Sequence, residues 1–274
     1  MGKTKQKISR EGWRTTKKER RSYIIGDLGR TLEGYIVTAM MSTFMIFQGI
    51  NMAAIAGAML IVKIIDAFDD VIFGYLVDRI HITEWKALKK VTGEGKYLPW
   101  YRLTFFLFPI FTALFFCMPR GWGAGGKLAW FFIFYLLYDL SYTLVEVPMQ
   151  SMIVTLTDNT DERNSILQTK TIINSIATIG AGMLWTVAIS EHVGIGIREV
   201  ALVSSVAFFF MMLPLGRGVK EHNTTLANVD PTETEKYSLK DMWTCIKTNK
   251  YLMLLLLSTV ITSCLQTGGA VGLL

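Results

Sequence analysis

The chain has 274 residues, of which 51% are hydrophobic and 18% are charged, and its formal net charge is +6. Soluble domains contain about a quarter charged residues, so this composition favours a membrane protein. A soluble helical bundle would show apolar stripes beside a polar face, whereas runs such as 103–118 and 252–260 are apolar all round.

Residues 1–22 form a segment rich in lysine and arginine. It is not a signal peptide, because no short apolar core with a small-residue cleavage site follows it. We predict a basic, solvated cytoplasmic tail that helps to set membrane orientation. The apolar segments that follow make nucleic acid an unexpected partner, although such tails can bind it.

Six long apolar segments follow the tail, and a seventh reaches the last residue. Each is long enough to cross the ~30 Å hydrocarbon core as a helix of about 20 residues. They occupy residues 32–50, 53–77, 98–118, 128–156, 166–189, 193–215 and 251–274. We therefore predict an all-α membrane protein. Its six-helix bundle covers residues 23–215, a polar cytoplasmic linker covers 216–250, and a seventh span, 251–274, begins a second bundle.

Positive residues are distributed unevenly among the predicted loops. The loops near 79–97 and 216–250 are rich in lysine and arginine, whereas the loop at 48–51 has neither. The positive-inside rule then places the amino terminus in the cytoplasm of a multi-pass protein of the cell membrane. The three cysteines and three histidines form no pattern for a disulfide or a zinc site. No reactive cluster suggests a membrane enzyme acting on lipid-linked sugars.

The second predicted span carries three acids, Asp66, Asp69 and Asp70, in an otherwise apolar segment. A charge at the centre of a membrane helix costs about 2.5–3.5 kcal/mol, so these side chains should face a protein interior or a cavity. Their spacing places them on one helical face, with Lys63 one turn earlier. Oxygens from Asp66 and Asp70 can converge on one hard cation.

The fourth predicted span has a second polar stripe. Asp139, Tyr142, Thr143 and Glu146 follow one another at helical spacing, and Pro148 comes two residues later. A proline inside a membrane helix frees a backbone carbonyl, often beside a cavity. The alternative is that these acids lie near the membrane face or pair with basic residues.

Two other predicted spans bring charge close to the bundle. In the first, Asp27, Arg30 and Glu33 share a face, with Thr31 between them. We expect Asp27 to belong to an interfacial ion network. In the fifth, Lys170 either extends to the interface or is the positive partner of a substrate or of an acid on the fourth span.

Three motifs together carry a family resemblance. They are Lys63-x-x-Asp66-Ala-x-x-Asp70-x-x-x-Gly74-x-x-x-Asp78, Gly95-Lys96-x-x-Pro99-Trp100, and Tyr142-Thr143-x-x-Glu146-x-Pro148. In order and spacing they resemble the glycoside–pentoside–hexuronide:cation symporters, the melibiose-permease group of the major facilitator superfamily.

This resemblance implies roles for particular residues. It implies a cation site at Asp66 and Asp70, assisted by Asp69 and Thr143. It implies substrate contacts at Glu146, Tyr142, Arg30, Thr31, Gln150 and Lys170. It also implies a cytoplasmic gate at Lys63, Gly74, Asp78, Arg79 and Lys96. Thr31 stands where melibiose permease has an aspartate and Gln150 where it has a tryptophan, so melibiose specificity is not predicted.

The predicted function is sodium- or proton-coupled symport of a sugar or glycoside by alternating access, without enzymatic activity or a cofactor beyond the coupling ion. The expected partners are the sugar, a monovalent cation and the lipid bilayer. Because the family architecture has twelve spans, a missing carboxyl-terminal half or a second copy is expected too. Two alternatives are a major-facilitator carrier for a lipid or drug-like solute, with a laterally open apolar cavity, and a membrane scaffold that does not transport.

Overall fold

The computed structural model describes residues 12–80, 82, 85–190, 193–222, 244, 247–251, 253–254 and 257–258. The chain divides into two units, Met1–Ala227 and Asn228–Leu274. In the second unit most of the few described positions are helical. Much of the predicted linker and of the predicted seventh span lies outside the described residues, so these two predictions stay predictions.

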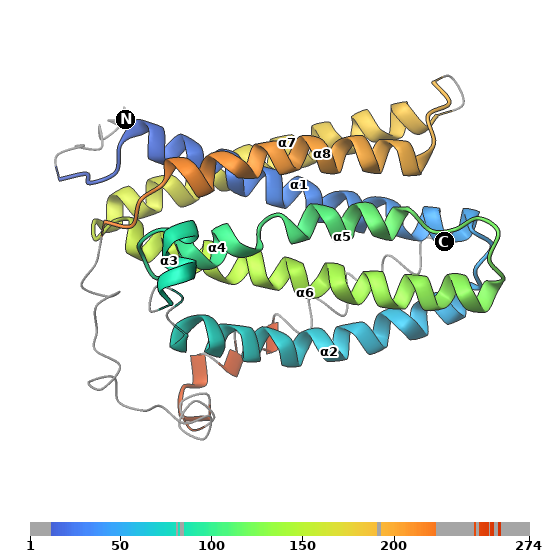
Figure 1. Ribbon diagram of the computed structural model, residues 1–274, viewed down its shortest axis with the longest axis horizontal. Coiled ribbons are helices and arrows are strands. Elements are labelled where there is room, and N and C mark those ends of the chain that lie inside the picture. The colour runs from blue at the N-terminus through green and yellow to red at the C-terminus, as the bar shows by residue number, and fades with distance from the viewer. Residues whose placement is uncertain are drawn as a thin grey trace, which may run out of the picture. The chain divides into compact units, whose positions relative to one another are not determined.

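The first unit consists of helices and has no strands among its described residues (Figure 1). The helices are α1 (Lys17–Phe47), α2 (Met52–Arg79), α3 (Lys86–Thr92), α4 (Leu98–Thr104), α5 (Leu107–Phe116), α6 (Ala124–Leu156), α7 (Thr160–Ile189) and α8 (Ile197–Gly218). The long helices run side by side in a bundle, and short α3 lies at one end. The predicted all-α class is confirmed.

Four helical segments in the described part are long and apolar enough to cross a membrane: Leu98–Phe116, α6, α7 and α8. Helices α1 and α2, with 31 and 28 residues, exceed the length that a span requires, but charged side chains interrupt their apolar sequences. The spans on α1 and α2 therefore stay predictions. Together these segments indicate a multi-pass membrane protein.

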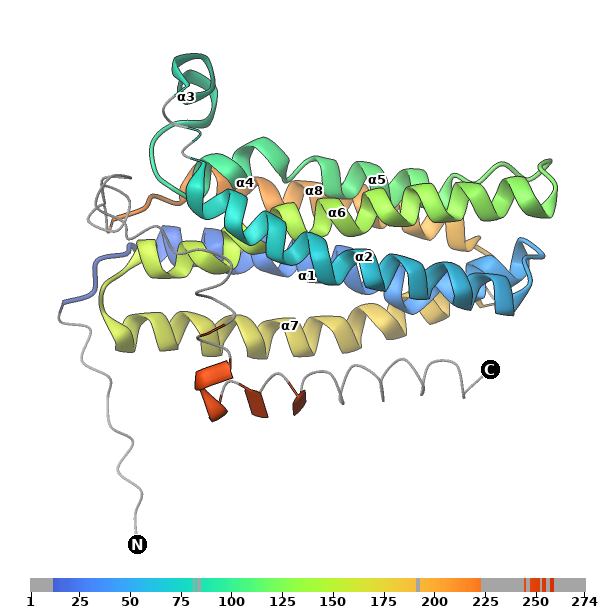
Figure 2. The ribbon, with the colours of Figure 1, turned by 90° about the horizontal axis from the view of Figure 1, so that it is seen from below.

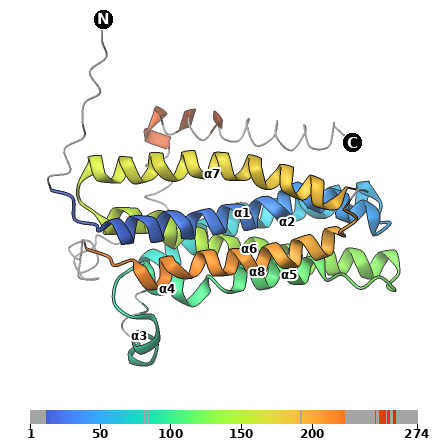
Figure 3. The ribbon, with the colours of Figure 1, turned by 90° about the horizontal axis from the view of Figure 1, so that it is seen from above.

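Helices α1 and α6 are the two centres of packing. Helix α1 packs against α8 on one side and α7 on the other, while α6 packs against α2, α4 and α5. Figures 2 and 3 show α7 lying along α1 at the edge of this unit. Its outward face carries exposed apolar side chains: Ile172, Ile176, Ile179, Met183, Leu184 and Val187. Such a face suits lipid or further protein.

The predicted third span, residues 98–118, is two helices instead of one. Helix α4 ends at Thr104, and α5 begins at Leu107. Pro109 explains the break, because a proline has no amide proton to donate and its ring clashes with the carbonyl four residues earlier. That residue is Phe105, which lies in the connection between the two helices.

Helix α1 begins well before its apolar segment. Thr16 caps it through a capping box in which the Thr16 hydroxyl accepts from the Glu19 amide at 3.2 Å and Glu19 accepts from the Thr16 amide at 2.7 Å. Residues 17–22, which composition places in a solvated tail, are the first turns of this helix. Burial acts to raise the pKa of Glu19, but the bonds from Thr16 and His222 outweigh it and lower that pKa.

The residues before α1 are also held in place. The buried Glu162 carboxylate, in the first turn of α7, accepts from the Arg14 amide at 3.0 Å and from the Thr15 amide at 3.1 Å. Arg20 and Thr157 reach the same carboxylate at 3.2 Å and 2.6 Å. The end of the predicted tail therefore docks onto the bundle instead of extending into solvent.

Glycines bring α1 and α8 into close contact. A Cβ on Gly29 would lie 2.9 Å from Cβ of Met211, and one on Gly26 would lie 2.8 Å from Cδ1 of Leu215 and closer still to its Cβ. Side-chain atoms essentially never come so close without displacement. The absence of a side chain at these two positions therefore sets the separation of α1 and α8.

Replacing Gly26 with alanine should destabilise the bundle by about 1–3 kcal/mol, because the added methyl group forces α1 and α8 apart. Gly57→Ala is the matched control, since no described atom lies within 4 Å of a Cβ at Gly57 on α2. Alanine there should be neutral or stabilising, by up to about 1 kcal/mol, through helix propensity. Thermal unfolding of the detergent-purified protein measures both. Equal midpoints for the two variants would contradict the close packing at Gly26.

Candidate cation and substrate sites

The three acids of α2 gather at one point. Asp66, Asp69 and Asp70 each present a carboxylate oxygen within 4.8 Å of the others. Asp69 is buried, Asp66 is half-buried and Asp70 is exposed. From α6, the buried Thr143 hydroxyl donates to Asp70 Oδ1 at 3.0 Å. The structure thus brings the four predicted cation ligands together, and the donor set consists of oxygens alone, which suits a hard cation.

Asp27 is the centre of a second cluster, on α1. It is fully buried, and its carboxylate lies 3.4 Å from Nη2 of Arg30 and 3.5 Å from Nζ of Lys170. Asn174 donates to its other oxygen at 2.7 Å. The expected ion network is therefore present, but Asp27 lies inside the bundle and not at an exposed interface, because α7 covers it with Lys170 and Asn174.

Arg30 extends this cluster to α6. Its guanidinium donates to the Tyr142 hydroxyl at 2.8 Å and lies 3.3 Å from the Glu146 carboxylate. Arg30 is 6% exposed, whereas the Glu146 side chain is 30% exposed. The basic group is therefore held inside by partners on both helices, and the acid on α6 reaches the accessible edge of the cluster.

Lys170 closes the network from α7. Its ammonium donates to Gln150 at 3.0 Å, and Gln150 donates to Glu146 at 3.4 Å. Thr31 accepts from Asn174 at 3.1 Å. Lys170 is 8% exposed, so the bundle encloses it. Its acidic partner is Asp27 of α1 and not an acid of α6.

All six residues predicted to contact substrate therefore lie in one network that joins α1, α6 and α7. Asp27 and Asn174 belong to it as well, although neither is among the predicted contacts. Helical spacing offers a signal for both, because Asp27 precedes Arg30 by three residues and Asn174 follows Lys170 by four.

Two adjacent residues of α6 connect the clusters. Tyr142 accepts from Arg30, while Thr143 donates to Asp70. One residue therefore contacts the α1 network and the next contacts the α2 acids. A movement of α6 must change both sets of contacts together.

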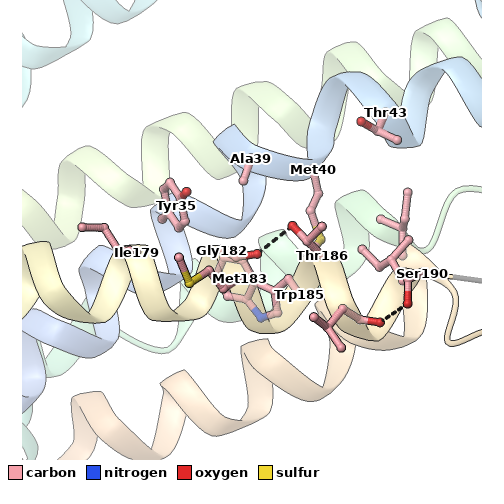
Figure 4. Close-up of a pocket in the computed structure, with 13 residues that line it drawn as sticks. Tyr35, Ala39, Met40, Thr43, Ile179, Gly182, Met183, Trp185, Thr186 and Ser190 are labelled. Atoms are coloured by element: carbon pink, nitrogen blue, oxygen red, sulfur yellow. Dashed lines mark hydrogen bonds between the residues drawn. The ribbon is translucent and has the colours of Figure 1, made fainter. Parts of the chain in front are cut away.

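A cavity of about 900 Å³ lies between α1, α7 and the start of α8. Figure 4 shows Tyr35, Ala39 and Thr43 of α1 facing Gly182 and Thr186 of α7 across it. On α1 these positions follow Asp27 and Thr31 at intervals of four residues, so they share one helical face. On α7 they follow Lys170 and Asn174 at multiples of four residues and share a face in the same way. The ring of Tyr35 stacks on Trp185 with centroids 5.6 Å apart. The seam between α1 and α7 thus passes from a polar cluster into a largely apolar cavity.

Four of the five predicted gate residues, Gly74, Asp78, Arg79 and Lys96, lie at or near the end of α2 or follow it in the chain. Asp78 is 3.3 Å from Nζ of Lys96 and accepts from the Tyr97 hydroxyl at 2.9 Å. Burial and the neighbouring Asp78 raise the pKa of Tyr97, which keeps this hydroxyl a donor. The Arg79 guanidinium lies 5.0 Å over the Tyr75 ring. Of the other predicted gate residues, Gly74 lies on α2, and Lys63 is on α2 with its side chain outside the described residues.

Comparison with known proteins points to one family. The family model described as MFS/sugar transport protein matches residues 22–274. The chain is 28% identical over 241 residues to the isoprimeverose transporter of Lactiplantibacillus pentosus, covering 82% of this chain and 47% of that protein. It is 27% identical over 261 residues to the putative sulfoquinovose importer of Escherichia coli, covering 89% and 50%.

A third relative is the glucuronide carrier protein homolog of Escherichia coli, which is 28% identical over 153 residues, or 55% of this chain and 30% of that protein. The chain spans about half the length of the first curated relatives it matches. The names of these relatives describe transport and not catalysis.

Proposed function

The chain belongs to the MFS/sugar transport protein family, which confirms the predicted resemblance, and we propose on that premise that its protein is a cation-coupled symporter of a sugar or glycoside. The relatives are named for isoprimeverose, sulfoquinovose and glucuronide, which are all sugar compounds. Because the chain spans about half of the longer relatives, the activity proposed is that of the whole protein.

The observation that supports sugar transport best is the polar network of α1, α6 and α7 inside an otherwise apolar bundle. Arg30 and Lys170 provide charged donors, and Glu146 and Gln150 provide acceptors. A sugar presents hydroxyls that both donate and accept, so it can replace contacts that these side chains make with one another. Glu146 is the most accessible acid of the network, so an entering sugar contacts it first.

The coupling ion is assigned to the acids of α2. Asp66 and Asp70, with Asp69 and Thr143, offer oxygens to a sodium ion, and the same carboxylates can be neutralised by a proton. Neutralising the cluster removes the cost of holding like charges together in the bundle. Through Thr143 and Tyr142, the same event reaches Arg30 and the sugar site.

Alternating access then requires the cytoplasmic contacts to open and close. We assign Asp78, Lys96 and Tyr97 to this gate, with the amino terminus in the cytoplasm of a cell-membrane protein. The rocking of helix bundles around a central site is the general mode of such carriers.

One observation favours a second candidate. The cavity of Figure 4 is lined mainly by apolar side chains, which suits a carrier of an apolar, lipid-like solute. A glycoside with an apolar substituent would use both the cavity and the polar network. Competition by free sugars distinguishes the two candidate functions, because free sugars do not displace an apolar solute that bypasses the network.

Uptake into proteoliposomes tests the proposal. The full-length protein is supplied with a panel of labelled glycosides, pentoses and hexuronates under an inward sodium gradient, an inward proton gradient or neither. We expect one class of sugar to accumulate above its external concentration under one of the gradients only, and empty liposomes to show none. Equal uptake with and without both gradients would refute the cation coupling.

A further inference from the structure

A second kind of acidic site lies on α1, apart from both clusters. Glu33 is 0% exposed, and Thr112 of α5 and Ser205 of α8, themselves 0% and 2% exposed, lie beside its carboxyl group. Neither carboxyl oxygen of Glu33 has a hydrogen-bond partner among the described residues, and the same is true of the Ser205 hydroxyl. Neither proposed binding site uses this group.

The hydroxyl groups around Glu33 indicate which protonation state of its carboxyl group they can accommodate. Thr112 already donates its proton to the Phe108 carbonyl at 3.0 Å, so its oxygen can only accept another bond. The Tyr138 hydroxyl of α6, which also interacts with Glu33, donates to the Gly34 carbonyl at 3.4 Å. An ionised carboxylate would therefore turn its charge toward the lone pairs of Thr112. A protonated carboxyl can donate to Thr112 and accept from Ser205.

The charged groups of the surrounding helices do not supply a cation. Helix α5 has no ionisable residue, and those of α8, Arg198, Glu199 and Arg217, lie near its two ends. The lysine of α7 that faces α1, Lys170, is bound to Asp27 and Gln150. On α6, Tyr138 interacts with Glu33, and it is not basic. Arg30, one turn before Glu33, pairs with Asp27 and Glu146, and no ion pair among the described residues includes Glu33.

We propose that Glu33 is a proton-binding site that holds its proton at neutral pH and uses it to join α1 to α5 and α8. A buried carboxylate without a partner is far more costly than the neutral acid, so the site selects the proton. This site is distinct from the acids of α2, and its occupancy does not depend on the transport proposal.

Infrared spectroscopy tests this directly on the full-length protein at neutral pH, without sugar. The carbonyl stretching band of protonated carboxylic acids should contain a component in the wild type that Glu33→Gln removes. Glu199→Gln, at an exposed position of α8, should leave the band unchanged. An identical band in the wild type and Glu33→Gln would overturn the proposal. So would a loss of the band on adding sodium at fixed pH, because the site would then take a metal ion.

A second variant keeps the test valid should Glu33→Gln fail to fold. Thr112→Val removes the acceptor but retains Glu33, and the band should shift to higher frequency as its hydrogen bond weakens. An unshifted band would exclude the proposed bond to Thr112.

Thermal unfolding adds a third measure: the midpoint of the wild type should fall relative to that of Glu33→Gln as pH rises, because only the wild type can lose the proton. A difference in midpoint that does not vary with pH would contradict the proposal.

Discussion

Replacing Asp70 with asparagine is expected to abolish gradient-driven accumulation of sugar. The amide keeps the shape of the side chain and can still accept from Thr143, but it carries no charge with which to bind the coupling ion. Loss of one charged ligand interaction of about 1.5–3 kcal/mol lowers the cation affinity roughly 10- to 100-fold. Uptake into proteoliposomes under the coupling gradient measures accumulation, and sugar exchange without a gradient should persist.

Asp161→Asn is the matched control for this change. Asp161 is exposed in the first turn of α7, outside both clusters, so the same chemical substitution should leave accumulation unchanged. If Asp70→Asn accumulates sugar as the wild type does, the acids of α2 are not the coupling site. Loss of sugar exchange together with accumulation would instead indicate damage to the bundle.

The cation cluster could be predicted because it depends on local geometry. Asp66, Asp69 and Asp70 lie on one helix, and a spacing of three and four residues places them on one face whatever the rest of the fold does. Thr143 is different, since it lies 73 residues from Asp70. Spacing cannot show that α6 packs on α2 at that level, so this contact followed only from the family resemblance.

Burial of Asp27 shows what local patterns miss. Arginines precede and follow it in the sequence, at Arg21 and Arg30, which is typical of a membrane interface. The side chains that enclose it come from α7, with Asn174 147 residues away. Only the packing of α7 along α1 converts an apparent surface acid into the centre of a buried network.

The start of α1 and the break between α4 and α5 differ from the predicted spans, because those spans were predicted from hydropathy. Hydropathy locates the apolar part of a helix, and α1 extends through a charged segment that hydropathy excludes. The capping box of Thr16 and Glu19 is a sequence signal that marks the true start. Pro109 likewise marks the break between α4 and α5, because its effect falls four residues earlier, at Phe105.

Replacing Arg30 with glutamine should lower sugar affinity about 100-fold, although the protein still folds. Arg30 donates to Tyr142 and pairs with Glu146 and Asp27, so its loss leaves Glu146 without this cation and removes a charged donor from the network. Lys170 remains beside Asp27 and keeps that buried acid neutralised. Two charge-assisted bonds of about 1.5 kcal/mol each correspond to this loss.

The measurement is equilibrium binding of the transported sugar to the purified full-length protein. Arg21→Gln is the control on the same helix, because Arg21 is exposed and lies outside the network; its sugar affinity should equal that of the wild type. Thermal unfolding checks that the Arg30 variant is folded when binding is measured. A Kd that stays within about twofold of the wild type would remove Arg30 from the sugar site. In that case the network would only stabilise the packing of α1 against α6, and the sugar would have to bind along the cavity between α1 and α7 instead.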